Sequence, residues 1–207
     1  MAEQSPVSEP RSTADAPPAP APSPDAGPAR PTLRERQAPL KERYAADPAS
    51  AALTITVRSV TEGDAPTRCA VAARPGGDGD EVVWPVGAHP FAGGEGDLAC
   101  SGDLLLASLA ACQEITVRMV AAAMGIALDA VAVEVRGEMD FRGTMGLDPT
   151  VPVGFRRVAT DVRIAADAPA DRLERLARRA EQFCVVAATL RQPPELTTTI
   201  TAESVAR

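Results

Sequence analysis

The chain has 207 residues, of which 45% are hydrophobic, and its formal net charge at pH 7 is −7. This acidic balance excludes nucleic acid as the main partner, because phosphate binding requires a basic surface and the sequence has no basic tract. The four cysteines include no Cys-x-x-Cys pair and there is a single histidine, so we expect no metal ion and no disulfide framework. We also expect no cofactor.

Residues 1–33 are rich in proline and alanine and are expected to form a disordered tail. Nine of the chain's 20 prolines lie within residues 1–31, and such a segment has little apolar surface to bury. It lacks the basic start and continuous apolar core of a signal peptide, which favours a cytoplasmic protein. Residues 34–51 are expected to form a charged, partly helical arm, and residues 52–207 one domain with its own core.

Alternation of apolar and polar residues predicts three strands after the arm, at residues 53–58, 68–74 and 81–86. The loop between the last two consists of turn-forming residues, so these strands are expected to pair as a hairpin. The glycine-rich loop that follows, residues 87–98, lacks the Gly-Lys-Ser/Thr ending of a phosphate-binding loop. Its histidine, His89, is more readily explained as a solvated loop residue than as the partner of a catalytic cysteine.

The stretch from Ala99 to Gly125 predicts one long helix around which the domain is organised. Ser101 or Asp103 is expected to cap its first amides, and Gly125 to end it in a left-handed turn. Apolar residues lie on more than one face of this helix, so a second subunit is expected to cover it. The longest apolar run, residues 104–115, is too short and too polar to cross a bilayer, so no membrane contact is expected.

The rest of the chain alternates again between strand and helix patterns. We expect two strands, two consecutive helices and a last strand, at residues 131–141, 158–164, 167–183, 184–190 and 196–202. Asp167 as the cap and Pro169 in the first turn open the first of these helices. Hairpins dominate and helices do not alternate with strands, which predicts an α+β fold with a largely antiparallel sheet.

Cys112 lies in the middle of the long helix, on its inward-facing stripe beside the hydroxyls of Ser108 and Thr116. A lone helical cysteine is more often a small buried apolar residue than a reactive group. Cys184 changes this expectation, because it lies near a helix start, where the helix dipole lowers the pKa of a thiol. Two such thiols that meet in space can cycle between dithiol and disulfide and so reduce an oxidant.

The sequence carries LLLASLAACQ at residues 104–113, a valine-alternating strand after it, and then DFRGTMG, VGFR and AEQFCVV at residues 140–146, 153–156 and 180–186. These motifs, over residues 53–202, resemble the OsmC/Ohr family of osmotically inducible and organic hydroperoxide resistance proteins. The resemblance implies an OsmC-like α+β fold with a central buried helix, in an intertwined homodimer with two active sites at the subunit interface. It also implies reduction of organic hydroperoxides, with electrons from a dithiol or a lipoylated protein.

The resemblance assigns the family's peroxidatic cysteine to Cys112 and its resolving cysteine to Cys184. The family has a glutamate ten residues before the first cysteine, which orients an arginine that stabilises the thiolate. Here that position is Gly102, and Asp103 is the nearest acid. The arginine is expected from the N-terminal region, where the candidates are Arg43, Arg68 and Arg74. Val185 replaces the proline that usually follows the resolving cysteine.

These features together predict a thiol-dependent peroxidase, an oxidoreductase with an antioxidant role in the oxidative stress response. The alternative is a protein of the same fold that binds or carries a small hydrophobic or sulfur-containing molecule and does not reduce peroxides. The missing glutamate and the long tail keep this alternative open. Cys69 is expected to pack in the core. Cys100 is expected to be structural, with an approach to Cys184 or to a thiol of another subunit as the alternative.

Overall fold

The computed structural model describes residues 31–61 and 63–204. The chain divides into two units, Met1–Thr32 and Leu33–Arg207, and the description that follows concerns the second. Apart from residues 31–33, the predicted disordered tail lies outside the described residues, and Leu33 already begins a helix.

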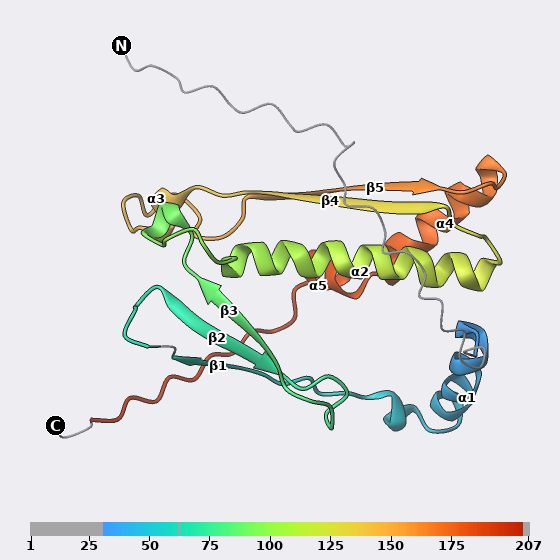
Figure 1. Cartoon of the computed structure of the whole chain (residues 1–207), viewed down its shortest axis with the longest axis horizontal. Coiled ribbons are helices and arrows are strands. Elements are labelled where there is room, and N and C mark those ends of the chain that lie inside the picture. The colour runs from blue at the N-terminus through green and yellow to red at the C-terminus, as the bar shows by residue number, and fades with distance from the viewer. Residues whose placement is uncertain (1–30, 62, 205–207) are drawn as a thin grey trace, which may run out of the picture. The chain divides into compact units, whose positions relative to one another are not determined.

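The described residues form helices and two antiparallel sheets, which confirms the predicted α+β class (Figure 1). The α-helices are α1 (Leu33–Ala46), α2 (Ser101–Met124), α3 (Phe141–Thr144), α4 (Ala170–Phe183) and α5 (Val185–Arg191), and short 3₁₀ helices are η2 (Pro48–Ala51) and η3 (Pro90–Ala92). The strands are β1 (Val57–Thr61), β2 (Arg68–Ala73), β3 (Val82–Gly87), β4 (Ala130–Glu138) and β5 (Arg157–Ala165). One sheet has the order β1-β2-β3, and the other pairs β4 with β5.

Helix α2 begins with a reciprocal capping box. The Cys100 Sγ accepts a hydrogen bond from the Asp103 N–H at 3.4 Å, and the Asp103 carboxylate accepts one from the Cys100 N–H at 2.9 Å. Of the two residues predicted to cap the first amides, Asp103 does so, whereas Ser101 does not. The N-cap itself is Cys100, whose sulfur accepts the hydrogen bond that a hydroxyl or carboxylate usually takes. Gly125, with φ 64°, ends the helix as predicted.

The β4–β5 sheet runs along α2, with α4 and α5 beside the helix (Figure 1). Residues of β4 alternate between exposed and half-buried, so one face of this sheet is turned to the core. Six buried apolar residues form two clusters in the described part of the chain, one of Leu109, Cys184 and Ala187 and the other of Ala121, Ile126 and Leu176. The first of these clusters holds the predicted redox site.

Helices α4 and α5 meet at Cys184, which ends the first and begins the second. The predicted break near Phe183 is thus confirmed. Helix α4 begins directly after Pro169, and no side chain caps it. The prediction of Asp167 as its cap is wrong, because Pro169 occupies the cap position and Asp167 precedes it by two residues.

Three predicted strands differ from the structure. Strand β1 begins at Val57, β4 ends at Glu138 before Asp140 caps α3, and residues 196–202 form no strand. The alternating apolar side chains of the two unpaired segments are exposed: Leu53 81%, Ile55 77%, Leu196 90% and Ile200 88%. Alternation identifies a face, but a strand also needs a neighbour for its backbone hydrogen bonds, and within the described part of this chain these segments have none.

Helix α2 also carries apolar surface that this chain leaves uncovered. Leu105, Ile115 and Met119 are 39%, 56% and 39% exposed. Among the described helices, α2 alone has the length and mean hydropathy, 1.5, of a helix that could cross a membrane, a property that core helices of soluble proteins share. It packs against β4, α4 and α5, but this chain alone buries only 22% of its most apolar stretch.

Candidate functional site

Cys112 and Cys184 lie in contact within one apolar cluster. Cys112 comes from the middle of α2 and Cys184 from the junction of α4 and α5, and both pack with Leu109 and Ala187. Cys184 is fully buried, Cys112 is partly exposed, and both are free thiols. The structure therefore brings together the two cysteines that the sequence singles out as a redox pair.

The surroundings of the two thiols shift their pKa values in opposite directions. Burial alone would raise the pKa of Cys112, but hydrogen bonds from the Val186 N–H, the Cys184 thiol, the Thr116 hydroxyl and the Val185 N–H outweigh it and lower the pKa below its ordinary value. Burial raises the pKa of Cys184, and its hydrogen bond to the Cys112 sulfur raises it further. Of the two thiols, Cys112 is therefore the one that ionises more readily, and Cys184 the one that retains its proton more strongly.

Cys112 forms part of the wall of a cavity of about 700 Å³ that opens between α1, α2 and the α4–α5 junction. We call it the Cys112 pocket. Most of its wall is apolar and comes from α2 and the α4–α5 junction: Ile115, Met119, Val120, Ala123, Met124, Phe183 and Val185. Its polar lining includes Gln37 and Lys41 from α1, Thr116 from α2 and Arg179 from α4. The chemistry offered here is a nucleophilic sulfur in an apolar cavity with two cations at the wall.

The arginines expected from the sequence lie elsewhere. Arg43 stacks over the Tyr44 ring, with 5.3 Å from its Cζ to the ring centroid. Arg74 pairs with Glu81 at 3.5 Å, and Arg68 pairs with Glu95 and, at 2.7 Å, with Asp97. None of the three lines the Cys112 pocket.

The cations that do line the pocket, Lys41 and Arg179, were not expected from the sequence. A signal for Arg179 exists, because it lies one helical turn before Phe183 on the helix that leads to Cys184. Lys41 has no such signal, since its position depends on how α1 packs against α2.

A family model for OsmC-like protein matches residues 94–199, just over half of the chain and including both cysteines of the pair. The chain belongs to the OsmC-like family. The OsmC-like protein from Mycoplasma pneumoniae has a similar structure, with a TM-score of 0.53 and 18% identity over 68% of this chain and 89% of that one. The structure of an OsmC-like protein of unknown function from Vibrio cholerae is also similar, with a TM-score of 0.52 and 10% identity over 67% of this chain and 94% of that one.

A third structure is that of an organic hydroperoxide resistance protein from Legionella pneumophila, with a TM-score of 0.49 and 20% identity over 69% of this chain and 92% of that one. This last similarity is too low to bear on function. At such low sequence identities the solved structures support the fold alone. No protein with a curated description matches this chain.

This OsmC-like chain has Gly102 where a glutamate was expected from the sequence, and the ring of Phe155 lies close to it. A Cβ at Gly102 would lie 3.3 Å from Phe155 Cζ and 3.4 Å from Cys100 Sγ. Asp103, the nearest acid, is held in the capping box, where hydrogen bonds from Cys100 lower its pKa. Asp103 lies nine residues from Cys112, about 13 Å along the helix axis, which is too far for a contact with the Cys112 sulfur. The structure shows it only as a capping residue of α2.

The other candidate residues, His89 and Cys69, make contacts that stabilise the fold and do not line the Cys112 pocket. His89 caps η3, since its Nδ1 accepts a hydrogen bond from the Phe91 N–H at 3.1 Å, and its ring stacks on Phe141 at 5.0 Å. Cys69 lies on β2 opposite Val86 of β3. In the described residues no group of three or more His, Cys, Asp or Glu side chains is placed to hold a metal ion.

Proposed function

We propose that this OsmC-like protein is a thiol-dependent peroxidase that reduces organic hydroperoxides through Cys112 and Cys184. The observation that carries the proposal is the contact between two thiols whose pKa values are shifted in opposite directions. A lowered pKa favours the nucleophilic thiolate at Cys112, and a raised pKa keeps Cys184 protonated until the sulfur beside it is oxidised.

The reaction proceeds in two steps. The Cys112 thiolate attacks the outer oxygen of the hydroperoxide, an S–O bond forms as the O–O bond breaks, and the leaving alkoxide takes a proton and departs as an alcohol. The Cys184 sulfur then attacks the sulfenic acid at Cys112, which forms the disulfide and releases water. A dithiol or a lipoylated protein returns two electrons and two protons through a mixed disulfide.

The Cys112 pocket fits this chemistry. Its apolar wall suits the carbon chain of an organic hydroperoxide, and the cations Lys41 and Arg179 offset the negative charge of the thiolate and of the departing oxygen. Arg43 and Arg74 keep their predicted role only if a second subunit supplies them. We assign Arg179 to this task because it belongs to the same helix that presents Cys184.

The exposed apolar side chains of this chain support the homodimer predicted from its sequence. Residues 53–56 and 196–202 have the alternation of strands without a neighbour, and α2 exposes Leu105, Ile115 and Met119. A second copy would cover these surfaces and provide the missing strand partners. In this account two equivalent sites form per dimer.

One observation favours the alternative function, a binding or carrier protein of the same fold. The glutamate expected to orient the arginine is absent, and the Phe155 ring lies 3.3 Å from the point where a Cβ at Gly102 would stand. Such a protein would bind its molecule in the Cys112 pocket and turn over no peroxide.

Consumption of cumene hydroperoxide with dihydrolipoamide as reductant tests between the two functions. A peroxidase sustains turnover over many equivalents, whereas a binding protein stops after a single equivalent or none. Arg179→Ala should lower kcat/KM about tenfold, less than the roughly 100-fold seen for enclosed charge-stabilising donors, because Arg179 is exposed to solvent. The matched control is Arg178→Ala, whose arginine pairs with Glu174 at 3.6 Å and does not line the pocket.

A further inference from the structure

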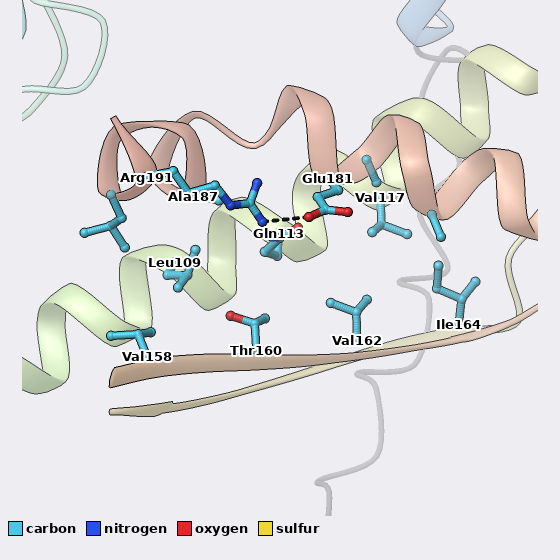
Figure 2. Close-up of a pocket in the computed structure, with 13 residues that line it drawn as sticks. Leu109, Gln113, Val117, Val158, Thr160, Val162, Ile164, Glu181, Ala187 and Arg191 are labelled. Atoms are coloured by element: carbon cyan, nitrogen blue, oxygen red, sulfur yellow. Dashed lines mark hydrogen bonds and ion pairs between the residues drawn. The ribbon is translucent and has the colours of Figure 1, made fainter. Parts of the chain in front are cut away.

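A second cavity of about 440 Å³ lies between α2, β5 and the α4–α5 pair, and it shares no lining residue with the Cys112 pocket. We call it the Gln113 cavity. Figure 2 shows how it is built: Val158, Thr160, Val162 and Ile164 rise from one face of β5 toward Leu109, Gln113 and Val117 of α2. Its size is within the range of small-molecule sites in proteins.

Most of the wall is aliphatic. Leu109 and Val117 from α2, Val158, Val162 and Ile164 from β5 and Leu190 from α5 supply it. No aromatic ring lines the cavity. Such a wall offers dispersion contacts and water exclusion to an alkyl chain and makes no directional demand on it.

Two polar groups in this wall lack hydrogen-bond partners. Gln113 is only 7% exposed, yet its side-chain amide makes no hydrogen bond to the described part of the chain, and neither does the Thr160 hydroxyl. In the described residues no fully buried side-chain nitrogen or oxygen lacks a hydrogen-bond partner, so the polar atoms of Gln113 are accessible from the cavity. There they can bind a ligand in place of water. An amide with donors and an acceptor, facing a hydroxyl across an aliphatic cavity, is a recognition pattern for a ligand that carries its own polar group.

The charges at the rim are already compensated. Arg191 Nη2 of α5 donates to Glu181 Oε1 of α4 at 2.7 Å, and both side chains are exposed (Figure 2). Among the residues that the structure describes, these are the only charged ones that line the cavity. A charged ligand would therefore meet no unpaired countercharge there, and the occupant must be neutral.

We propose that the Gln113 cavity binds a small neutral molecule with an aliphatic body and one carboxamide, carbonyl or hydroxyl group, which hydrogen bonds to Gln113 and Thr160. The site uses neither Cys112 nor Cys184 for binding and so goes beyond the peroxidase proposal. Leu109 and Ala187 line this cavity and also pack on Cys184. The occupant thus touches the apolar cluster that holds the cysteine pair.

Octanamide is a suitable probe, because it joins an alkyl chain to a neutral amide, and octanoate is its charged counterpart. Titration into the full-length protein, followed by calorimetry and by methyl NMR shifts, should give saturable octanamide binding with shifts at Val162 and Ile164. Gln113→Leu, which keeps the side-chain volume and removes the amide, should weaken binding at least tenfold, and so should Thr160→Val. Octanoate should bind at least tenfold more weakly than octanamide.

The matched control is Gln37→Leu, the same exchange at a glutamine that lines the Cys112 pocket, and it should leave the octanamide affinity unchanged. Three results would overturn the proposal: no saturable binding up to the solubility limit, loss of binding in Gln37→Leu but not in Gln113→Leu, or shifts confined to Ile115 and Met119. If side chains of a second copy fill the cavity in solution, the first of these results follows. This experiment measures ligand binding and not peroxide turnover. A failure of the ligand-site proposal is therefore distinguishable from a failure of the peroxidase proposal.

Discussion

The opposite pKa shifts of Cys112 and Cys184 arise from where α5 begins. The N–H groups of Val185 and Val186 lie in the first turn of α5, have no partner within that helix and donate to the Cys112 sulfur. Cys184 precedes them, is fully buried and gives its own proton toward Cys112. The side chains of the pair can be predicted from the sequence, since both cysteines lie in recognisable motifs. The backbone amides that shift the pKa of Cys112 cannot be predicted in this way, because no side-chain pattern indicates which sulfur a backbone N–H faces.

The pH dependence of alkylation tests this arrangement at Cys112. A thiol with a lowered pKa is ionised at lower pH, so the rate of iodoacetamide modification at Cys112 should reach half its maximum below the pH of an ordinary thiol. Thr116→Val removes one of the hydrogen bonds that lower the pKa and should move this midpoint upward. Mass spectrometry assigns the modified residue.

Ser108→Ala is the matched control for that experiment. The Ser108 hydroxyl donates to the Leu105 carbonyl at 2.7 Å and not to the sulfur, so its removal should leave the midpoint unchanged. A Cys112 midpoint at or above that of an ordinary thiol would contradict the account.

The unpaired amide of Gln113 has a consequence for stability. Gln113→Leu replaces an amide that makes no hydrogen bond to the described part of the chain by an apolar side chain of similar volume, which raises the free energy of unfolding by about 1 kcal/mol. The midpoint of thermal unfolding should rise by roughly 2–4 °C in a chain of this size. Gln37→Leu, on α1, should change it little, and a lower midpoint for Gln113→Leu would show that the amide has a partner within the protein.

At the scale of the elements, the ring of Phe155 packs against both the start of α2, at Gly102, and the end of β4, at Gly137. A Cβ at Gly137 would lie 2.5 Å from Phe155 Cε1 and 3.0 Å from Leu106 Cδ1, closer than side chains pack. The same ring lies over Gly102. The Phe155 ring therefore restricts side-chain size most strongly at Gly137, and at Gly102 it leaves a Cβ only a tight contact of 3.3 Å.

Gly137→Ala tests this packing. The added methyl group forces the Phe155 ring to move, and such overpacking lowers the free energy of unfolding by about 1–3 kcal/mol. Gly154→Ala is the control, because a Cβ there meets nothing within 4 Å and the residue needs no positive φ. Equal unfolding midpoints of the two variants in a denaturant titration would rule out the contact.

Several elements whose partners lie in the same chain were predictable from the sequence, although the bounds of β1 and β4 were not. The α2 helix, the β2–β3 hairpin and the break at Cys184 depend on local patterns and short loops, and they were predicted correctly. Residues 53–56 and 196–202 have equally good alternation but no strand beside them in the described part of the chain. A periodic pattern reports which face of a segment is apolar, and it says nothing of what covers that face.

At the scale of the whole molecule, the uncovered apolar residues predict a dimer. Light scattering at micromolar concentration should give twice the chain mass of 21.4 kDa. The double variant Leu196→Asp, Ile200→Asp places charges in the exposed apolar segment and should shift the mass toward the monomer. Leu147→Asp, at a residue that is 75% exposed outside these segments, is the control. A monomeric mass for the unmodified protein would refute the assembly.

Single-turnover and steady-state reduction of cumene hydroperoxide by cysteine variants tests the central claim most directly. Cys112→Ser should abolish turnover, because the nucleophile is lost. Cys184→Ser should reduce one equivalent of peroxide and leave a sulfenic acid at Cys112 that dimedone traps, whereas Cys69→Ser and Cys100→Ser should keep turnover near that of the unmodified protein. Turnover retained by Cys112→Ser, or dimedone labelling at another cysteine, would contradict the assignment of Cys112 and Cys184 as the redox pair.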